Sequence, residues 1–113
     1  MNLIKRNGSM KQFDVYLVEL DPTKGSEMQK TRPAVIISPD AMNNNLQTVI
    51  VAPLTNTIKG YPSRVVSNFA GVNGEIALDQ IRAVDKGRLV KRKGKVVAAV
   101  AGDIKKVLGV MFS

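Results

Sequence analysis

The sequence predicts a mainly β fold in which a small curled sheet or barrel is packed by one C-terminal α-helix. Short runs rich in β-branched and aromatic residues recur along most of the chain, with proline, glycine and asparagine between them. Only the last stretch has helical periodicity, because its apolar residues recur three and four positions apart from Val97 to Met111. Strands at close spacing followed by one helix are typical of a small barrel-like domain.

The first half of the chain is expected to supply three strands. The second of them is short and almost entirely apolar, which suits a strand covered on both faces. Prolines at positions 22, 39 and 53 end the three strands, because proline cannot donate a backbone hydrogen bond. Asp40 is expected to cap a short helical turn. In order, these elements are strands over 13–20, 33–38 and 46–52, with the helical turn over 41–43 between the last two.

The second half alternates extended segments with turn signals. A loop over 56–60 precedes a strand over 61–66. Val72-Asn73-Gly74 predicts a turn, since Asn-Gly tolerates positive φ at low cost. Extended structure is expected to resume over 75–82, with a short strand over 88–91 and the helix at the end.

The 113 residues are expected to form one domain, since no repeat, linker or change of composition divides them. A second methionine at position 10 indicates that residues 1–9 are either an extension or follow an alternative start. No apolar run approaches the roughly 18 residues that cross a bilayer, and the first ten residues lack a signal-like apolar segment. We therefore expect a cytoplasmic protein without membrane contact, which the absence of cysteine also fits.

Two missing residue types limit the chemistry. Without cysteine there are no disulfides, no thiolate catalysis and no cysteine metal sites. Without histidine the chain lacks the usual acid–base group near neutral pH and the commonest metal ligand. The nine Asp and Glu residues include no close pair, so we expect neither a metal site nor a cofactor. Any catalysis must use carboxylates, arginine, lysine, tyrosine or hydroxyls.

The positive charge is concentrated in the second half. Of the formal net charge of +8, residues 1–56 supply +1 (six cations against five acids) and residues 57–113 supply +7 (eleven against four). The segment from Lys86 to Lys95 contains six cations and no acid. A polyanion such as RNA is the partner that this charge favours, because neutralising phosphates releases counterions. A solvated basic face and an acidic protein partner are the alternatives.

The stretch Asp21-Pro-Thr-Lys-Gly-Ser-Glu-Met-Gln-Lys-Thr-Arg-Pro33 places unusually dense polar chemistry before a buried strand. Gly25 permits a sharp or left-handed backbone that would return the loop across the sheet. Arg32 precedes a proline, which biases its backbone to extended conformations, and its guanidinium is a fork of donors suited to a phosphate. A structural ion pair between Arg32 and Glu27 or Asp21 is the alternative.

Two further places carry candidate site residues. A strand ending at Pro53 delivers Thr55 and Asn56 at the start of a loop, where their side chains could donate to a phosphate oxygen or serve only as turn residues. Asp79 is flanked by Leu78 and Ile81, so it is expected to be partly buried and to need a partner. It is either a structural hydrogen-bond hub or a reacting group.

Taken together, four blocks of the sequence closely resemble the MazF/PemK (Kid-like) toxins of bacterial toxin–antitoxin pairs. They occur in the family's order and at family-like spacing, and the resemblance covers roughly residues 11–90, with a looser match through the terminal helix. The blocks are LDPTKGSE (20–27), TRPAVIISP (31–39), VAPLT (51–55) and LDQIRAVD (78–85).

This resemblance implies a small SH3-like curled sheet or barrel of the MazF/PemK/CcdB type that forms a homodimer. It also implies a metal-independent, sequence-specific endoribonuclease, an mRNA interferase, which cuts single-stranded RNA. The implied protein partner is an acidic MazE-like antitoxin whose flexible tail covers the active groove. An acidic partner agrees with the basic second half of the chain.

By motif position, the resemblance makes Arg32 the catalytic arginine and Thr55 the catalytic threonine, while Glu27 and Asp79 match acidic positions of the site. Some Kid-like members place a second arginine two residues before the aspartate, where this chain has Ala77. The positions expected to contact RNA lie in the two loops and in the last block: Gly25, Ser26, Lys30, Thr31, Asn56, Lys59, Tyr61, Gln80 and Arg82.

The residue chemistry agrees with such a reaction. RNA carries its own nucleophile, the 2′-OH, whose attack on the adjacent phosphorus yields a 2′,3′-cyclic phosphate and a 5′-OH end without a metal-bound water. Arg32 can stabilise the developing charge and Thr55 can hold a non-bridging oxygen. A carboxylate, Glu27 or Asp79, is the conventional base that remains.

Two other functions are compatible with the sequence. A non-catalytic toxin that binds DNA gyrase, as the related CcdB toxins do, would have the same architecture but would not require Arg32, Thr55 and Asp79. A basic RNA-binding barrel is less favoured, because only 4% of residues are aromatic and such modules bind through stacking. Tyr61 is the best single stacking candidate, and surface packing is its alternative role.

Overall fold

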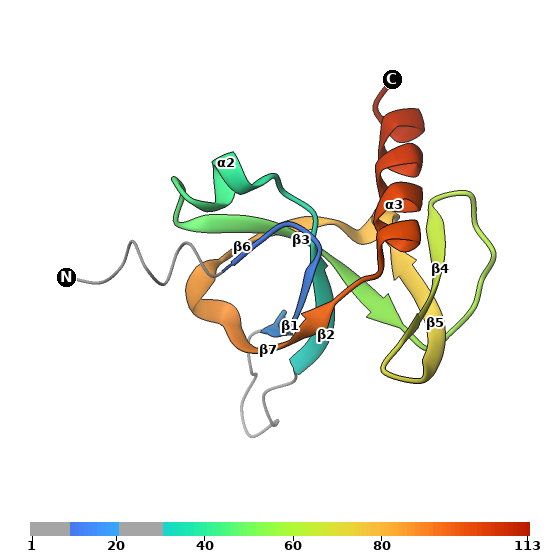
Figure 1. Ribbon diagram of the computed structural model, residues 1–113, viewed down its shortest axis with the longest axis horizontal. Helices are drawn as coiled ribbons and strands as arrows, with labels where there is room; N and C mark the ends of the chain where they lie inside the picture. Colours follow the sequence, from blue (N-terminus) through green and yellow to red (C-terminus); the bar gives the residue numbers. More distant parts are fainter. Residues whose placement is uncertain (1–9, 21–30) are drawn as a thin grey trace, which may run out of the picture.

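The structure, a computed structural model, describes residues 10–20 and 31–113. Its elements confirm the predicted fold class, since strands account for most of them and one long helix ends the chain (Figure 1). In order they are β1 (Asp14–Glu19), β2 (Thr31–Ile36), α2 (Asp40–Asn43), β3 (Thr48–Thr55), β4 (Arg64–Phe69), β5 (Val72–Ala77), η1 (Leu78–Gln80), β6 (Arg82–Asp85), η2 (Lys86–Arg88), β7 (Leu89–Lys95) and α3 (Ala98–Met111).

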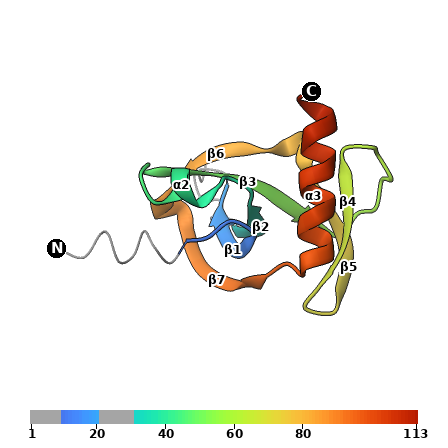
Figure 2. The ribbon, with the colours of Figure 1, turned by 45° about the horizontal axis from the view of Figure 1, so that its top comes forward.

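The strands form one curled antiparallel sheet in the order β4-β5-β3-β2-β1-β7, with β6 paired to the first half of β3. Strand β3 is shared by both ends of this sheet. Its first part pairs with β6 and β2, and its last two residues pair with β5. The β4–β5 hairpin therefore projects from the rest of the sheet, and α3 lies against β4 (Figures 1 and 2).

Buried apolar side chains lie on both faces of the sheet, as strand alternation requires. On β1, Val15 points into the cluster that α3 covers through its buried Ile104, whereas Val18 points into the opposite cluster. The same alternation continues on β2, where Val35 belongs to the α3 side and Ile36 to the other side. Both faces of the sheet are thus covered by apolar side chains. Polar residues at the ends of its strands remain accessible to a ligand.

Two sequence predictions about turns and strand ends are wrong. The predicted turn at 72–74 lies inside β5, and the chain instead reverses at Ala70 and Gly71, whose φ angles are 54° and 79°. Two successive residues with positive φ between paired Phe69 and Val72 match the twist of a hairpin. Asn-Gly is a plausible turn signal, but Gly74 is required for another reason: a Cβ there would lie 2.2 Å from the Thr55 carbonyl oxygen.

The second error concerns β3, which the sequence predicts to end before Pro53 and which continues through Pro53 to Thr55. Pro53 is the last β3 residue paired with β2, and Leu54 is the first paired with β5. The missing N–H of the proline therefore falls where the strand changes partners, which is a position that a sheet tolerates.

The remaining boundaries differ from the predicted ones by a few residues, with two larger changes. The extended segment predicted over 75–82 is interrupted by η1, and the last strand, β7, runs seven residues rather than four. The C-terminal helix agrees with the prediction, and so does the short helical turn except for its cap. Asp40 is the first residue of α2 rather than its cap, and its carboxylate instead accepts a hydrogen bond from the backbone N–H of Gln12 (2.7 Å). In the part of the chain that is described, no helix has the length and apolar character to cross a membrane.

Candidate functional site

Arg32 lies near the start of β2, with its side chain exposed at the end of the sheet. It is paired with Val18 of β1, and its side chain is on the face of Ala34 and Ile36, away from α3. Within residues 10–20 and 31–113, no ion pair or hydrogen bond engages the guanidinium. The alternative partners that the sequence offers, Glu27 and Asp21, lie outside the described residues.

The register of β2 and β3 places the two principal candidates, Arg32 and Thr55, at the same end of these two strands. Ala34 is opposite Pro53 in this register, and Ile36 is opposite Val51. The pairing ends at Ala34 and Pro53, because Leu54 and Thr55 pair with β5 instead. Arg32 and Thr55 each lie two residues beyond the last β2–β3 pair, and alternation gives Arg32 the face of Ala34 and Thr55 the face of Pro53.

Thr55 is the last residue of β3, at a strand end that delivers a polar side chain to a loop. Its Oγ1 accepts a hydrogen bond of 3.1 Å from the backbone N–H of Thr57, which closes a small turn and orients the hydroxyl. Both roles considered for this threonine are therefore compatible, because a hydroxyl that accepts from the backbone still has its own proton to donate.

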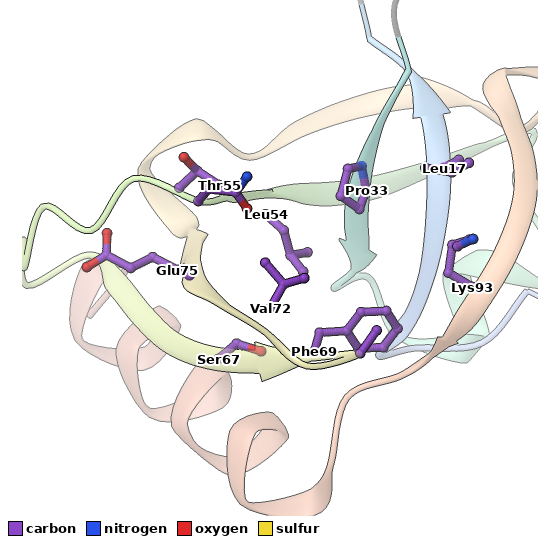
Figure 3. Close-up of a pocket in the computed structure, with 12 residues that line it drawn as sticks. Leu17, Pro33, Leu54, Thr55, Ser67, Phe69, Val72, Glu75 and Lys93 are labelled. Carbon is purple, nitrogen blue, oxygen red and sulfur yellow. The ribbon is translucent and has the colours of Figure 1, made fainter.

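An apolar hollow of about 260 Å³ lies between these strands and the β4–β5 hairpin. Leu17, Pro33 and Leu54 line one side of it, and Phe69 and Val72 of the hairpin line the other (Figure 3). The hydroxyl of Thr55 and the carboxylate of Glu75 are directed away from these apolar side chains (Figure 3). The polar candidates are thus turned away from the apolar interior of this hollow.

A second polar group lies beside Thr55 on β5, where Glu75 is paired with Thr55 across the strands. The Glu75 side chain is only 1% exposed. It accepts hydrogen bonds from the backbone N–H groups of Lys59 (3.0 Å) and Gly60 (2.9 Å), and from Arg64 Nη1 (3.2 Å). These donors, the Lys59 N–H first, lower the pKa of Glu75 from its usual value against the opposing effect of burial.

Asp79, in η1, is a hydrogen-bond hub. Its Oδ1 accepts from Ser63 Oγ (2.8 Å) and from Arg64 Nε (2.7 Å), and its Oδ2 accepts from Arg64 Nη2 and Gln80 Nε2 (3.3 Å each). The Arg64 hydrogen bond is the largest cause that holds the pKa of Asp79 far below its usual range. A carboxylate with so low a pKa is a weak proton acceptor at neutral pH, so the geometry favours the hub over the reacting group.

Arg64 and Glu75 are site residues that the sequence prediction missed. Arg64 lies opposite Ala77 across the β4–β5 hairpin, and is diagonal to Glu75. The misplaced turn is the reason, because a turn at 72–74 gives a different register and does not make Arg64 a neighbour of Glu75. An acid at position 75 within an otherwise apolar segment was the available signal, since a buried acid requires a partner.

The other predicted RNA-contacting residues divide into two groups. Those of the first loop, Gly25, Ser26 and Lys30, lie outside the described residues together with Glu27. The others are exposed on the surface, either at the start of β2, in the β3–β4 loop or around η1 and β6: Thr31, Asn56, Lys59, Tyr61, Gln80 and Arg82.

The basic segment over 86–95 does not act as one surface. Lys86 is buried, and its ammonium donates to the backbone oxygen of Asn43. Arg88 donates to the backbone oxygen of Glu19 (3.0 Å), and Arg92 forms an ion pair of 3.2 Å with the buried Asp14. Three of the six cations thus stabilise the fold, which leaves the exposed lysines of β7, Lys91, Lys93 and Lys95, as the surface charge.

Among the described residues, no three carboxylates gather in a way that could hold a metal ion. The groups that do gather are an arginine, a threonine and a pair of carboxylates bound to a second arginine. A guanidinium and a hydroxyl are both donors suited to a phosphate oxygen, and this small curled sheet with a C-terminal helix carries them near the ends of two of its strands.

Comparison with known proteins gives the family. The model of the "PemK-like, MazF-like toxin of type II toxin-antitoxin system" family matches residues 11–112, so this chain belongs to that family. The chain is 35% identical over 100 residues to the endoribonuclease toxin MazF of Escherichia coli K12, covering 88% of this chain and 90% of that one. It is 32% identical over 108 residues to the endoribonuclease PemK of Escherichia coli, covering 90% and 81%.

Solved structures agree with this assignment. A crystal structure of MazE–MazF from Deinococcus radiodurans is similar with a TM-score of 0.77 at 27% identity, covering 90% of this chain and 94% of that one. The resemblance found in four short blocks of sequence is therefore confirmed over the whole folded domain.

Proposed function

We propose that this chain is the toxin of a type II toxin–antitoxin pair and acts as an endoribonuclease on single-stranded RNA. The observation that carries the proposal is the β2–β3 register, whose last pair is Ala34 and Pro53, because Arg32 and Thr55 each lie two residues beyond that pair, at the same end of the two strands. Membership in a toxin family supports it, as do relatives named endoribonucleases that are 35% and 32% identical.

In the proposed reaction, the ribose 2′-OH attacks the adjacent phosphorus. A bond forms between the 2′ oxygen and phosphorus, the bond from phosphorus to the 5′ oxygen breaks, and the products are a 2′,3′-cyclic phosphate and a 5′-OH. The guanidinium of Arg32 would stabilise the charge that develops on the phosphoryl oxygens, and Thr55 would donate to a non-bridging oxygen. No metal is part of this route.

In a chain without histidine or cysteine, a carboxylate is the conventional base for the 2′-OH proton. The low pKa of Asp79 argues against that residue. We therefore assign the base to Glu27 and give Asp79 a positioning role. The departing 5′ oxygen takes its proton from water or from the guanidinium of Arg32.

The test is incubation of the purified protein with a long mixed RNA in EDTA, followed by mapping of the ends. We expect cuts at a short preferred sequence, with 2′,3′-cyclic phosphate and 5′-OH ends. A 2′-deoxy nucleotide at the cut should give complete resistance. Cutting of the deoxy substrate would overturn the mechanism, and intact RNA together with inhibited supercoiling by gyrase would favour the CcdB-like alternative.

We also propose a homodimer and an acidic antitoxin as the protein partners. The MazE–MazF structure from Deinococcus radiodurans supports the antitoxin, and the net charge of +8 supplies a physical reason for an acidic partner. Light scattering after size-exclusion chromatography measures the oligomeric state. Co-purification with the product of the neighbouring gene tests the antitoxin.

A further inference from the structure

The β3–β4 loop, over 56–63, is tied to the sheet by one buried carboxylate. Glu75 Oε1 accepts from the backbone N–H of Lys59, and Oε2 accepts from that of Gly60. A buried charge without such donors would be costly, so the loop and the carboxylate fix each other. The positive φ of Gly60 (71°) turns the chain at this contact. The loop is thereby held in one conformation next to Thr55.

Arg64 extends this attachment to η1. Its guanidinium donates through Nη1 to Glu75 (3.2 Å) and through Nε and Nη2 to Asp79 (2.7 and 3.3 Å). Two carboxylates on one planar guanidinium fix its orientation as well as its place. They also offset its charge, so Arg64 is a poor phosphate ligand compared with Arg32.

The guanidinium of Arg64 supports an aromatic ring. Its Cζ lies over the ring of Tyr61, 5.0 Å from the centroid, a cation–π arrangement. Tyr61 is nevertheless 49% exposed. Because the guanidinium occupies one face of the ring, the exposure belongs to the opposite face and the edge. Pro62 follows Tyr61, which biases the backbone of Tyr61 to extended conformations.

We propose that the outer face of Tyr61 is a stacking site for one unpaired nucleobase of the substrate RNA, and that Glu75 and Arg64 are positioning residues that hold the ring ready. This inference rests on the proposed function. An aromatic ring offers every base a stacking surface, and loss of such a ring typically weakens binding by roughly 5- to 150-fold. A ring already fixed by its supports loses little further freedom on binding, which favours affinity.

The surroundings favour a nucleotide over a protein side chain. The loop carries the exposed polar residues Asn56, Thr57 and Lys59 together with one exposed apolar residue, Ile58, so a nucleotide on Tyr61 would meet a loop with an exposed cation. The same loop begins at Thr55, whose hydroxyl is bonded to Thr57. The stacked base would therefore lie on the loop that begins at Thr55.

The experiment compares intact RNA with RNAs that each lack one base. A short cleavable RNA is made in versions with a single abasic nucleotide at successive positions, and kcat and KM are measured for each. For the wild-type protein, one abasic position near the cut should raise KM by about 5- to 150-fold. For Tyr61→Leu, intact RNA should already have the raised KM, and the abasic version should cause no further increase.

Tyr61→Phe retains the ring and should retain the preference for a base at that position. Leu46→Ala, at an exposed apolar residue after α2, is the matched control for loss of surface side chain. If Tyr61→Leu loses nothing relative to Tyr61→Phe, or if the two KM penalties multiply, the stacking site does not exist.

Glu75→Gln tests the positioning role, because an amide cannot accept all three hydrogen bonds that the carboxylate accepts. We expect the ratio of KM between abasic and intact RNA to fall toward one in this variant. A purely structural role of Glu75 would lower the melting temperature and leave that ratio unchanged. If Glu75→Gln does not fold, Arg64→Lys is measured instead, since lysine keeps the charge but not the fork geometry.

A binding measurement separates failure of this inference from failure of the proposed function. The fluorescent base 2-aminopurine is placed at successive positions of an RNA that carries 2′-deoxy nucleotides where cutting occurs, and its quenching by stacking is followed. Quenching by wild type and Tyr61→Phe but not by Tyr61→Leu supports the site even if no cleavage is found. Cleavage without any Tyr61-dependent quenching overturns the site and leaves the nuclease intact.

Discussion

Arg32 is the second residue of β2, and Arg64 is the first residue of β4. Their surroundings differ. Arg64 is bound by Glu75 and Asp79 and supports Tyr61, whereas no side chain of the described part engages Arg32. An arginine held by two carboxylates builds structure, and an exposed one without them can meet an incoming anion. The carboxylates around a guanidinium, more than the arginine itself, therefore decide whether it is available to an incoming anion.

Arg32→Ala should show the largest effect on activity. Loss of the charge-stabilising donor is expected to lower kcat by about 100- to 1,000-fold, as removal of one preorganised donor does in other enzymes. The melting temperature should stay close to that of the wild type, because the side chain is exposed and unengaged by described residues. Single-turnover cleavage of a labelled RNA in EDTA measures the loss, and undiminished cutting would remove Arg32 from the mechanism.

Arg64→Ala should have the opposite effect, a clear loss of stability with a smaller loss of activity. It leaves Glu75 buried without its counter-charge and frees Asp79, so the melting temperature should fall clearly. Cleavage should weaken mainly through KM, by about tenfold, since Tyr61 loses its support. Thermal unfolding and steady-state kinetics on the same preparations check both parts. A fall in kcat as large as that of Arg32→Ala, at unchanged stability, would mean that Arg64 also acts on the phosphate.

Thr55→Ala should lower kcat by about tenfold, since one neutral donor to a non-bridging oxygen is lost. Thr55→Ser keeps the hydroxyl that accepts from Thr57, so it serves as the matched control. Kinetics on an RNA with a single cut position measures both variants. Equal rates for the alanine and serine variants would show that Thr55 is only a turn residue.

Acid should remove the stability that Glu75 and Asp79 contribute around Arg64, while the exposed Arg32 keeps its charge. The folded pKa values of Glu75 and Asp79 are lowered, so the stability they contribute is present above their unfolded values near 4 and is lost as pH falls through that range toward the folded values. As pH falls from about 5 to 3, Glu75→Gln should take up fewer protons on unfolding than the wild type, by at most one. Urea unfolding at several pH values measures this, and parallel pH dependences would contradict it.

Lys93→Ala should have the smallest effect, a loss of affinity of about twofold at moderate salt. The exposed lysines of β7 contribute only diffuse charge, and each neutralised phosphate contact changes the salt dependence by about 0.7 of a unit slope for a single strand. Binding of uncleavable RNA over a series of salt concentrations measures the slope. Arg92→Ala is the contrasting variant, because Arg92 is paired with Asp14 and its loss should affect stability.

Local patterns are sufficient to predict much of this molecule. Periodicity and proline positions predict the amphipathic helix and the apolar β2 segment, and the predicted fold class is confirmed. The predictions that fail concern contacts between segments that are distant in the sequence. Nothing in the order of residues indicates that β3 changes partners at Pro53, or that Gly74 is needed for a close approach to the Thr55 carbonyl. These features depend on a strand that arrives from elsewhere in the chain.

The candidate site divides in the same way. Arg32, Thr55 and Asp79 belong to contiguous motifs, so the sequence predicts them as candidates, and their catalytic roles stay proposals. Arg64 and Glu75 meet only through the hairpin register, which the misplaced turn obscures. The basic segment is overestimated from sequence, because half of its cations bind buried partners that a charge count cannot identify.

The contact between Gly74 and the Thr55 carbonyl has a genetic consequence. At 2.2 Å there is no room for even a methyl group, so every substitution at codon 74 should force the hairpin away from the end of β3. Gly102 and Gly109 of α3 have open space where a methyl group would lie, so alanine there should be silent. Bacteria that survive forced expression of this chain should therefore accumulate varied replacements at codon 74 and few at those two.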